Sequence, residues 1–345
     1  VQAAKSGHPG MPMGMADVAT VLFSDFIRIN PADPSWPDRD RFVLSAGHGS
    51  MLHYALNHLL GYDDMTMDQL RNFRQLGSIT AGHPEYGVAK GIETTTGPIG
   101  QGLSNAVGKA IAEKILNQKY RNLINHKTYV IAGDGCLMEG VSHEVMSFAG
   151  VHKLDKLICF YDSNGISIDG KIDGWYRDNI SFRCEAYGWN VIDNIDGHDR
   201  NQINSAIISA KKSSKPTMIV CKTHIGYGSG DKQDSETSHG APLGNDVISK
   251  LRKNLNWPYK EFEIPQSVYS DWNNIDSGRR HEQEWHEIVK RHKESDVIKG
   301  ELLARLISGD MPEKFDEEFN KFLEDIKSDD QACLLYTSPS PRDCT

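Results

Sequence analysis

The sequence predicts an α/β fold in which a parallel sheet carries helices on both faces. The first observation is an apolar run, Tyr129–Ala132, that ends in a sharp Gly-Asp-Gly turn at residues 133–135. A helical pattern follows as far as Gly150, and a second apolar run, Leu157–Tyr161, then ends in a polar turn at residues 162–166. Strand, helix and strand in this order indicate a βαβ unit that brings both turns to one edge of the sheet.

A second unit of the same kind follows later in the chain. Trp189–Asp193 and Thr217–Cys221 are predicted as strands, and Asn201–Lys212 as the helix between them. Before both units, Arg41–Ser45 is predicted as a short strand that ends in a glycine-containing turn. Further helices are predicted over Met13–Ile29, Met51–Leu60, Met67–Phe73 and Leu103–Tyr120.

Composition narrows the class of protein. The chain has 345 residues, of which 38% are hydrophobic and 25% charged, and this is ordinary for a soluble globular protein. Its net charge of −9 argues against a nucleic-acid-binding protein. No apolar run approaches the roughly 18 residues of a membrane span, and no secretory signal opens the chain. The six cysteines form no C-x-x-C pair, so we expect free thiols and a cytoplasmic location.

The chemistry of the first unit follows from its two turns. Asp134 lies in the first turn and Asn164 in the second, so the crossover helix brings their side-chain oxygens to the same edge. Hard oxygen ligands of this kind suit Mg²⁺ or Ca²⁺, and a main-chain carbonyl near Ile166 would add a third ligand. The glycines and the following helix favour a bound anion, so we expect a metal-bridged diphosphate. Either turn alone is also explained as an ordinary tight turn, and only the pair favours a site.

Further motifs extend this pattern along the chain. They are SGHPG at Ser6–Gly10, GHGS at Gly47–Ser50, GHPE at Gly82–Glu85, TTTGPIGQG at Thr94–Gly102 and SHGAPLG at Ser238–Gly244. With the Gly-Asp-Gly turn and the later Asn164, they resemble the transketolase family of thiamine diphosphate enzymes, in the same order and with similar spacing. The resemblance covers residues 1–244 and continues more weakly to about Ile326. The family motif commonly ends in Asn-Asn, whereas this chain has Ser163-Asn164.

The resemblance implies a thiamine diphosphate-binding fold and a set of site residues. The implied cofactors of the protein are thiamine diphosphate and Mg²⁺, with Ca²⁺ as the alternative metal. The implied metal ligands are Asp134, Asn164 and Ile166. The implied cofactor-binding residues are His48, Gly97, Pro98, Ile99, Gly135, Asn164 and His239. The implied catalytic residues are His8, His83 and His239, of which His8 and His239 also bind substrate, and Glu139 and Glu144 form a proposed proton relay.

These histidines differ from the remaining ones in their surroundings. A histidine is by default a satisfied polar or surface group. His8, His48, His83 and His239 each lie in a loop bounded by Gly or Pro, where the backbone can approach a ligand. Imidazoles that titrate near neutrality can move hydroxyl protons while carbon–carbon bonds are cleaved and formed. For the glutamates Glu139 and Glu144, a surface salt bridge is the simpler alternative.

The domain organisation predicted from the sequence has three parts. Residues 1–250 form the α/β domain that binds thiamine diphosphate and the metal, and residues 251–330 form a helical extension and the start of a linker. Residues 331–345 resemble translated vector or adapter sequence and are expected to be non-native. Because the chain opens on Val1 and lacks the family's pyrimidine-binding domain with its activating glutamate, we expect a fragment that is inactive alone.

The resemblance also implies the reaction and the partners. The whole enzyme is expected to transfer a two-carbon ketol unit from a ketose phosphate, such as xylulose 5-phosphate, to an aldose phosphate, such as ribose 5-phosphate. It is expected to be a homodimer whose site is shared between subunits, with no nucleic-acid or membrane partner. Three alternatives stay open: a related enzyme such as dihydroxyacetone synthase or deoxyxylulose phosphate synthase, the diphosphate-binding subunit of a split enzyme, and an inactive relative that acts as an interaction protein.

Overall fold

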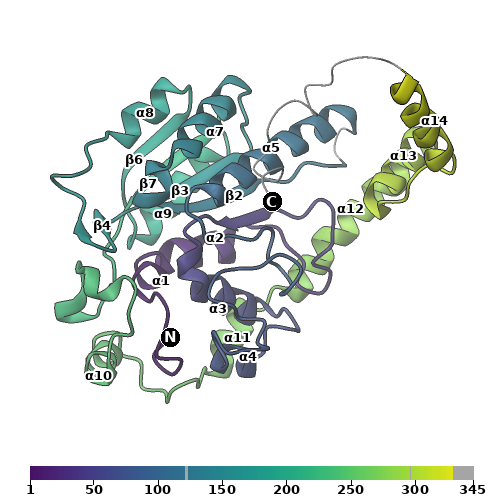
Figure 1. Cartoon of the computed structure of the whole chain (residues 1–345). Coiled ribbons are helices and arrows are strands. Elements are labelled where there is room, and N and C mark those ends of the chain that lie inside the picture. The colour runs from purple at the N-terminus through teal and green to yellow at the C-terminus, as the bar shows by residue number, and fades with distance from the viewer. Residues whose placement is uncertain (121–122, 296, 329–345) are drawn as a thin grey trace. The chain divides into compact units, whose positions relative to one another are not determined.

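A parallel sheet forms the centre of the structure, a computed structural model that describes residues 1–120, 123–295 and 297–328. In the described part of the chain the sheet has five strands, in the order β1-β2-β3-β7-β6, and every neighbouring pair is parallel (Figure 1). The strands are β1 (Arg41–Leu44), β2 (Thr128–Gly133), β3 (Leu157–Ser163), β6 (Asn190–Asp196) and β7 (Thr217–Lys222). A two-stranded antiparallel hairpin, β4 (Ile166–Ser167) and β5 (Gly170–Lys171), follows β3 directly.

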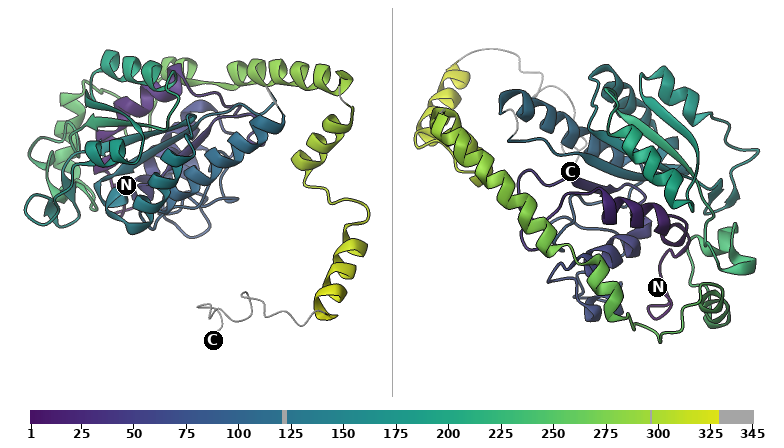
Figure 2. Two further views of the ribbon diagram at one scale, coloured as in Figure 1. Left: turned by 90° about the horizontal axis from the view of Figure 1, so that it is seen from above. Right: turned by 180° about the vertical axis from the view of Figure 1, so that it is seen from behind.

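Helices cover both faces of this sheet, as the sequence predicts. The helices between β1 and β6 are α3 (Ser50–Leu60), α4 (Met67–Arg71), α5 (Gln101–Lys119), α6 (Asp134–Met138), α7 (Gly140–Val151) and α8 (Ile180–Ala186). Helices α5 and α7 pack together on one face, and α9 (Arg200–Ala210) packs with α2 (Ala16–Asp25) on the other (Figures 1 and 2). The reason is topological: the chain reverses its direction across the sheet between β6 and β7, and right-handed crossovers then place α9 opposite α7.

The middle strands form the core. Residues 128–132 of β2, 157–162 of β3 and 217–221 of β7 are all buried, because helices cover both faces of the sheet at this point. Apolar residues therefore occupy consecutive positions in these strands instead of alternating with polar ones. Such uninterrupted apolar runs are the pattern from which the sequence predicts the strands. Tyr129 and Phe160, both fully buried, stack across neighbouring strands with ring centroids 6.5 Å apart.

One predicted helix is interrupted. The sequence predicts a single helix over Met13–Ile29, but the structure has α1 (Gly10–Gly14) and α2, separated at Met15, whose φ and ψ of −96° and 4° are not helical. A Cβ atom on Gly14 would lie 2.9 Å from the carbonyl oxygen of His224, so the first helix is packed tightly against a distant loop. This contact lies outside the reach of local sequence patterns.

The C-terminal region is helical. Its elements are α10 (Asn245–Asn254), α11 (Gln266–Trp272), α12 (Ile275–Ser295), α13 (Val297–Ser308) and α14 (Phe315–Ser328). Two compact units divide the chain, Val1–Lys290 and Arg291–Thr345, so most of α12 belongs to the unit that contains the sheet. The three-part division predicted from the sequence stays a prediction, and its proposed non-native tail, 331–345, lies outside the described residues.

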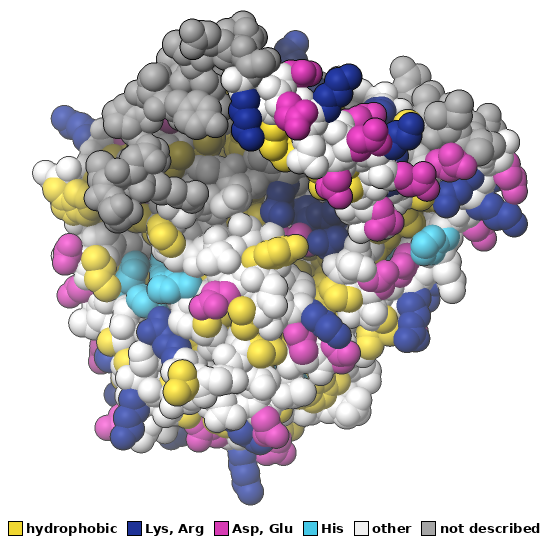
Figure 3. Space-filling model, turned by 45° about the vertical axis from the view of Figure 1, so that its right-hand side comes forward, with side chains coloured by type: hydrophobic (Ala, Val, Ile, Leu, Met, Phe, Trp, Pro, Cys, Tyr) yellow, Lys and Arg dark blue, Asp and Glu magenta, His cyan; other side chains and the backbone are white. Residues whose placement is uncertain are grey.

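The described surface carries charges of both signs. The face shown in Figure 3 mixes acidic and basic side chains, and it also carries a group of neighbouring histidine side chains. No helix in the described part of the chain has the length and apolar character needed to cross a bilayer.

Candidate functional site

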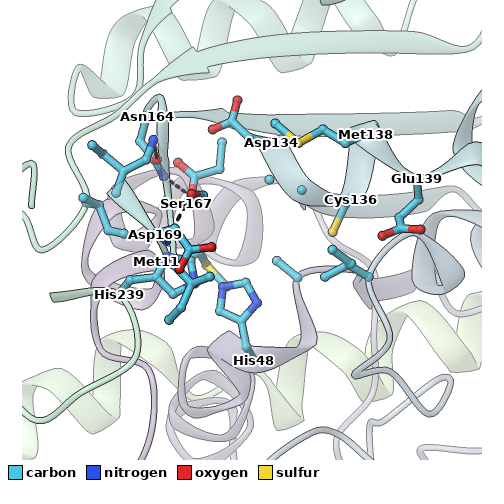
Figure 4. A pocket seen from close by; sticks show the side chains of 18 of the residues that line it. Met11, His48, Asp134, Cys136, Met138, Glu139, Asn164, Ser167, Asp169 and His239 are labelled. Carbon is cyan, nitrogen blue, oxygen red and sulfur yellow. Dashed lines mark hydrogen bonds between the residues drawn. The ribbon is translucent and has the colours of Figure 1, made fainter. Parts of the chain in front are cut away.

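Two polar turns meet at the carboxyl edge of the sheet. Strands β2 and β3 are parallel neighbours, with Gly133 opposite Asp162 at their ends. Asp134 therefore follows β2, and Asn164 follows β3, at the same edge. Both residues line a cavity of about 290 Å³. Figure 4 shows their side chains in its wall. The sequence predicts that the two turns of this βαβ unit bring Asp134 and Asn164 to one edge of the sheet, and the structure confirms it.

The carboxylate of Asp134 is buried but hydrogen-bonded. The Tyr161 hydroxyl donates to Oδ1 over 2.5 Å, and the Gly165 N–H donates to Oδ2 over 3.2 Å. Burial raises the pKa of Asp134, and the bond from Tyr161 opposes this rise. A charged carboxylate in such a place is stabilised further by a cation, because burial removes the water that would otherwise solvate it.

The amide of Asn164 has a fixed orientation. Its Nδ2 donates to Asp162 Oδ2 over 3.0 Å, while its Oδ1 accepts from the Ile166 N–H over 2.9 Å. Asp162 is fully buried, and burial raises its pKa to about 7. The Thr223 hydroxyl also donates to Asp162. Asp162 thus connects Asn164 to Thr223, the residue that follows strand β7, an arrangement typical of groups that orient a metal ligand.

The available donors suit a hard cation. Among the described residues, no three His, Cys, Asp or Glu side chains are grouped so as to hold a metal. The cavity wall includes the Asp134 carboxylate, the Asn164 amide and Ile166, together with the oxygen-bearing side chains of Glu139, Asp162, Ser167 and Asp169. Such a set of oxygen donors fits Mg²⁺ or Ca²⁺ and does not fit a softer metal.

Three of the predicted histidines form one cluster. His8 lies before α1, His48 in the short helix η1 (Gly47–Gly49) and His239 after η3 (Glu236–Ser238). The His48 and His239 rings stack with centroids 5.0 Å apart, and the His8 ring meets them edge-on at 5.2 and 6.0 Å. The η1 and η3 turns bring His48 and His239 to the cavity wall, opposite Asp134 (Figure 4).

The cluster is uncharged near neutral pH. Burial, followed by His239 and His8, lowers the pKa of His48 to about 3. Burial and Arg74 lower the pKa of His8 to about 4, and burial alone lowers that of His239. The buried Nδ1 of His239 has no hydrogen-bond partner among the described residues. Neutral rings with free nitrogen atoms are suited to exchange hydrogen bonds with the hydroxyl groups of a ligand.

His83 lies beside the cluster and is exposed. A Cβ atom on Gly97, where φ is 152°, would lie 3.2 Å from His83 Cγ, so this ring lies against the glycine of the Gly97–Ile99 turn. Partial burial of the ring and the nearby Arg74 lower the pKa of His83, in the same direction as for His8. His83 also acts electrostatically on His8 and His48, so it lies near these two rings, but it is not in the wall of the cavity formed by Asp134 and its neighbours.

The Gly97-Pro98-Ile99 turn reaches the cavity through its last residue. Ile99 is 37% exposed and lines the cavity, whereas Gly97 and Pro98 lie outside its wall. A Cβ atom on Gly135 would lie 3.2 Å from Ile99 Cδ1, so the two glycine turns approach each other closely. An apolar side chain therefore faces the polar turn that contains Asp134.

The two predicted glutamates are both exposed. Glu139, between α6 and α7, lines the cavity, and Glu144 lies on α7. A Cβ atom on Gly100 would lie 2.8 Å from Glu139 Cβ, which shows how closely the entry of α5 packs against Glu139. Their function as a proton relay stays a prediction.

Several residues of the site have no counterpart in the sequence prediction. Asp162, Tyr161 and Arg74 contact Asn164, Asp134 and His8 respectively. Apolar side chains complete the cavity wall: Met11, Met138, Ile168, Trp175 and Ile225. A mixed lining with a few convergent polar groups is typical of a small-molecule site. Asp162 could have been found, since an acidic residue at the end of a buried strand requires partners.

The parallel sheet, the paired turns at its carboxyl edge and the cavity between them define the class of protein, a cofactor-binding α/β domain. Comparison with known proteins identifies the family. The sequence profile of the family described as "Transketolase, thiamine diphosphate binding domain" matches residues 1–312, and the chain belongs to this family.

Individual relatives agree with this assignment. The chain is 51% identical to transketolase 1 of Escherichia coli over 333 residues, which cover 95% of this chain and 50% of that protein. Its structure is similar to transketolase from Leishmania mexicana, with a TM-score of 0.88, 43% identity and coverage of 91% of this chain and 48% of that one. The structure is also similar to transketolase from Campylobacter jejuni, with a TM-score of 0.84 and 45% identity. That match covers 90% of this chain and 48% of the other. The chain spans about half the length of the curated relatives that it matches.

Proposed function

We propose that this chain is the diphosphate-binding half of a transketolase. The complete enzyme would transfer a two-carbon ketol unit from a ketose phosphate of the xylulose 5-phosphate type to an aldose phosphate of the ribose 5-phosphate type. One observation supports this most strongly: a buried carboxylate and a fixed amide, Asp134 and Asn164, meet a cluster of neutral histidines at one cavity. A cytoplasmic homodimer with its site shared between subunits is part of the same proposal.

We assign the carboxyl edge of the sheet, where Asp134 and Asn164 lie, to the binding of a metal ion and the diphosphate. Asp134, Asn164 and the carbonyl of Ile166 would hold Mg²⁺, or Ca²⁺ in its place, which would balance the charge of the diphosphate. The Gly135 backbone, His48, His239 and the Gly97-Pro98-Ile99 turn would contact thiamine diphosphate. The buried Asp134 supports this, because burial raises its pKa and a bound cation would favour its charged form.

The histidines are assigned to the substrate. Thiamine diphosphate supplies the reactive carbon that carries the two-carbon unit between the sugars. His8, His83 and His239 would hold hydroxyl groups of the sugar and move their protons, because neutral imidazoles both donate and accept hydrogen bonds. The stacked His48 and His239 rings would shield the reacting centre from water on one side. Glu139 and Glu144 would connect two such sites across a dimer.

Cofactor binding gives the direct test. Titration calorimetry of the 345-residue chain should show thiamine diphosphate binding that requires Mg²⁺, and Asp134→Ala should abolish this metal dependence. Asp169 supplies a matched control, because it is an exposed carboxylate in the wall of the same cavity. Asp169→Ala is expected to leave the metal dependence in place. Equal affinity with and without Mg²⁺ in the unmodified chain would refute the metal-bridged site.

Turnover gives a second test. In thiamine diphosphate enzymes of this kind the activating glutamate belongs to a pyrimidine-binding domain, so we expect the purified 345-residue chain to show no ketol transfer alone. Adding a chain that carries this domain should restore formation of glyceraldehyde 3-phosphate in a coupled assay. Transfer by the pure chain would contradict the assignment of the chain as half of a site.

A further inference from the structure

Arg74 lies directly behind the histidine cluster. It is a half-buried residue between α4 and the Gly82-His83 turn, and its Nη2 lies 3.1 Å from His8 Nδ1. Its Nη1 donates to Ser6 Oγ over 3.0 Å, and its Nη2 also approaches the Gly82 carbonyl at 3.5 Å. The guanidinium therefore connects the loop that carries His8 with the loop that carries His83.

The backbone presents Arg74 in an unusual conformation. Its φ is 61°, in the left-handed region that non-glycine residues rarely adopt. The Arg74 N–H donates to the Thr80 carbonyl over 2.9 Å, which closes the loop between them. A Cβ atom on Gly82 would lie 3.2 Å from Arg74 Nε, so this glycine leaves space for the guanidinium. An energetically unfavourable backbone at a site residue suggests a functional constraint.

The contact fixes the proton of His8. A guanidinium has five N–H donors and no acceptor, so the His8 Nδ1 that faces it must accept the hydrogen bond. A neutral imidazole carries one proton, which must then lie on Nε2. We propose that Arg74 is a positioning residue that holds His8 in this single tautomer and so makes Nε2–H a permanent donor to a substrate hydroxyl oxygen. The substrate part of this inference rests on the proposed function.

The surroundings of His8 favour the same state. The groups that act on it electrostatically are Arg74, His239 and His83, and His48 lies edge-on to it. Burial, followed by Arg74, His239 and His83, lowers the pKa of His8 to about 4, so the ring stays neutral at pH 7. Its Nε2 lies on the side of Gly240, where a Cβ atom would be 3.5 Å away, beside the loop of His239. On this inference His8 binds the hydroxyl as a donor only, so the acceptance of hydroxyl protons proposed above would fall to His83 and His239. The Nδ1 of His239 has no partner among the described residues.

The tautomer can be measured directly. The full 345-residue chain, labelled with ¹⁵N at histidine and free of cofactor, is studied by nitrogen NMR, which distinguishes protonated from unprotonated ring nitrogen atoms. His8→Gln assigns the His8 signals by their loss. We expect an unprotonated Nδ1 and a protonated Nε2 at pH 7. A protonated Nδ1, or an equal mixture of tautomers, would overturn the proposal, and this result depends on no other variant.

Substitution of Arg74 tests the cause. Arg74→Met keeps the length of the side chain but removes its donors and charge, so His8 should become a mixture of tautomers and its pKa should rise. Arg74→Lys keeps a charged donor and should preserve the tautomer. Arg71→Met is the matched control, because Arg71 is exposed and pairs with Asp68 instead. A His8 signal that is the same in Arg74→Met as in the unmodified chain would contradict the proposal.

The measurement is independent of the proposed function. It is made without cofactor or substrate, so a failure of thiamine diphosphate to bind in calorimetry would leave the tautomer result standing. Conversely, metal-dependent cofactor binding together with a protonated His8 Nδ1 would leave the proposed function in place. It would refute only the inference that Arg74 fixes the tautomer of His8.

Discussion

Tyr161 donates its phenolic hydrogen to the carboxylate of Asp134, with 2.5 Å between the two oxygens, although 27 positions separate the two residues in the chain. Tyr161 lies in β3, and Asp134 is the first residue after β2. The bond supplies a donor to a carboxylate that has little access to water. It also joins strand β3 to the turn that contains Asp134, so the geometry of this edge depends on it.

We expect Tyr161→Phe to destabilise the cofactor-free chain by about 1–3 kcal/mol, the range for a lost hydrogen bond to a buried charged group. Chemical denaturation at pH 7 measures this change. Tyr176→Phe is the control, because Tyr176 donates to Asp178 over 2.9 Å in an exposed position. Loss of this exposed hydrogen bond should lower the free energy of unfolding by less than about 0.5 kcal/mol. Equal losses for both variants would show that Asp134 gains nothing particular from Tyr161.

Asp162→Asn tests the residue that orients Asn164. The substitution removes a carboxylate that accepts from both the Asn164 amide and the Thr223 hydroxyl. We expect the affinity for thiamine diphosphate in the presence of Mg²⁺ to fall about 10-fold or more, the usual effect of losing such a partner. Calorimetry gives this affinity, and Asp169→Asn serves as the comparison. An unchanged affinity would mean that the Asn164 amide is held without Asp162.

Two glycines in helices should respond in opposite directions to replacement by alanine. A Cβ atom on Gly150, in α7, would lie 1.7 Å from the Tyr187 carbonyl oxygen, so Gly150→Ala should destabilise the chain by roughly 3 kcal/mol or more. Gly108, in α5, has no atom within 4 Å of such a Cβ, and Gly108→Ala should stabilise the chain by about 0.5–1 kcal/mol. Thermal unfolding compares them. A loss of stability in Gly150→Ala well below this value would contradict the close packing of Gly150 against the Tyr187 carbonyl.

His53 should make the chain sensitive to acid. It is 2% exposed, packs edge-on against Phe42, and burial lowers its pKa to about 4. Between the unfolded pKa of about 6.5 and the folded value, the unfolded state binds more protons, so stability falls as the pH falls through this window. Relative to His53→Gln, the unmodified chain should lose about 2 kcal/mol between pH 7 and pH 5. Denaturation curves that stay parallel over this range would disprove the effect.

The sequence predicts the features that depend on strand order. Apolar runs and glycine turns identify β2 and β3, and the rule that parallel strands end at one edge then places Asp134 beside Asn164. These predictions are correct because they follow from local patterns and one topological rule. The α/β fold with helices on both faces is confirmed for the same reason.

Other features depend on contacts between distant segments. The break at Met15 accompanies the packing of Gly14 against His224, and the contact between Arg74 and His8 requires a left-handed residue in an irregular loop. The β4–β5 hairpin pairs only two residues on each side, which is too short to produce an alternating pattern. No periodicity reports such contacts, so they become visible only in three dimensions.

The strand order also has a consequence for synthesis of the protein. Strand β7 is the last of the sheet to leave the ribosome, yet it lies between β3 and β6. Until Lys222 has emerged, both neighbours have an unpaired edge in the middle of the nascent sheet, and such edges promote misassembly. Thr223, which bonds Asp162, emerges only after this strand. The cavity at the carboxyl edge is therefore one of the last parts of the domain to mature, and ribosome-bound chains that stop before β7 should depend on chaperones.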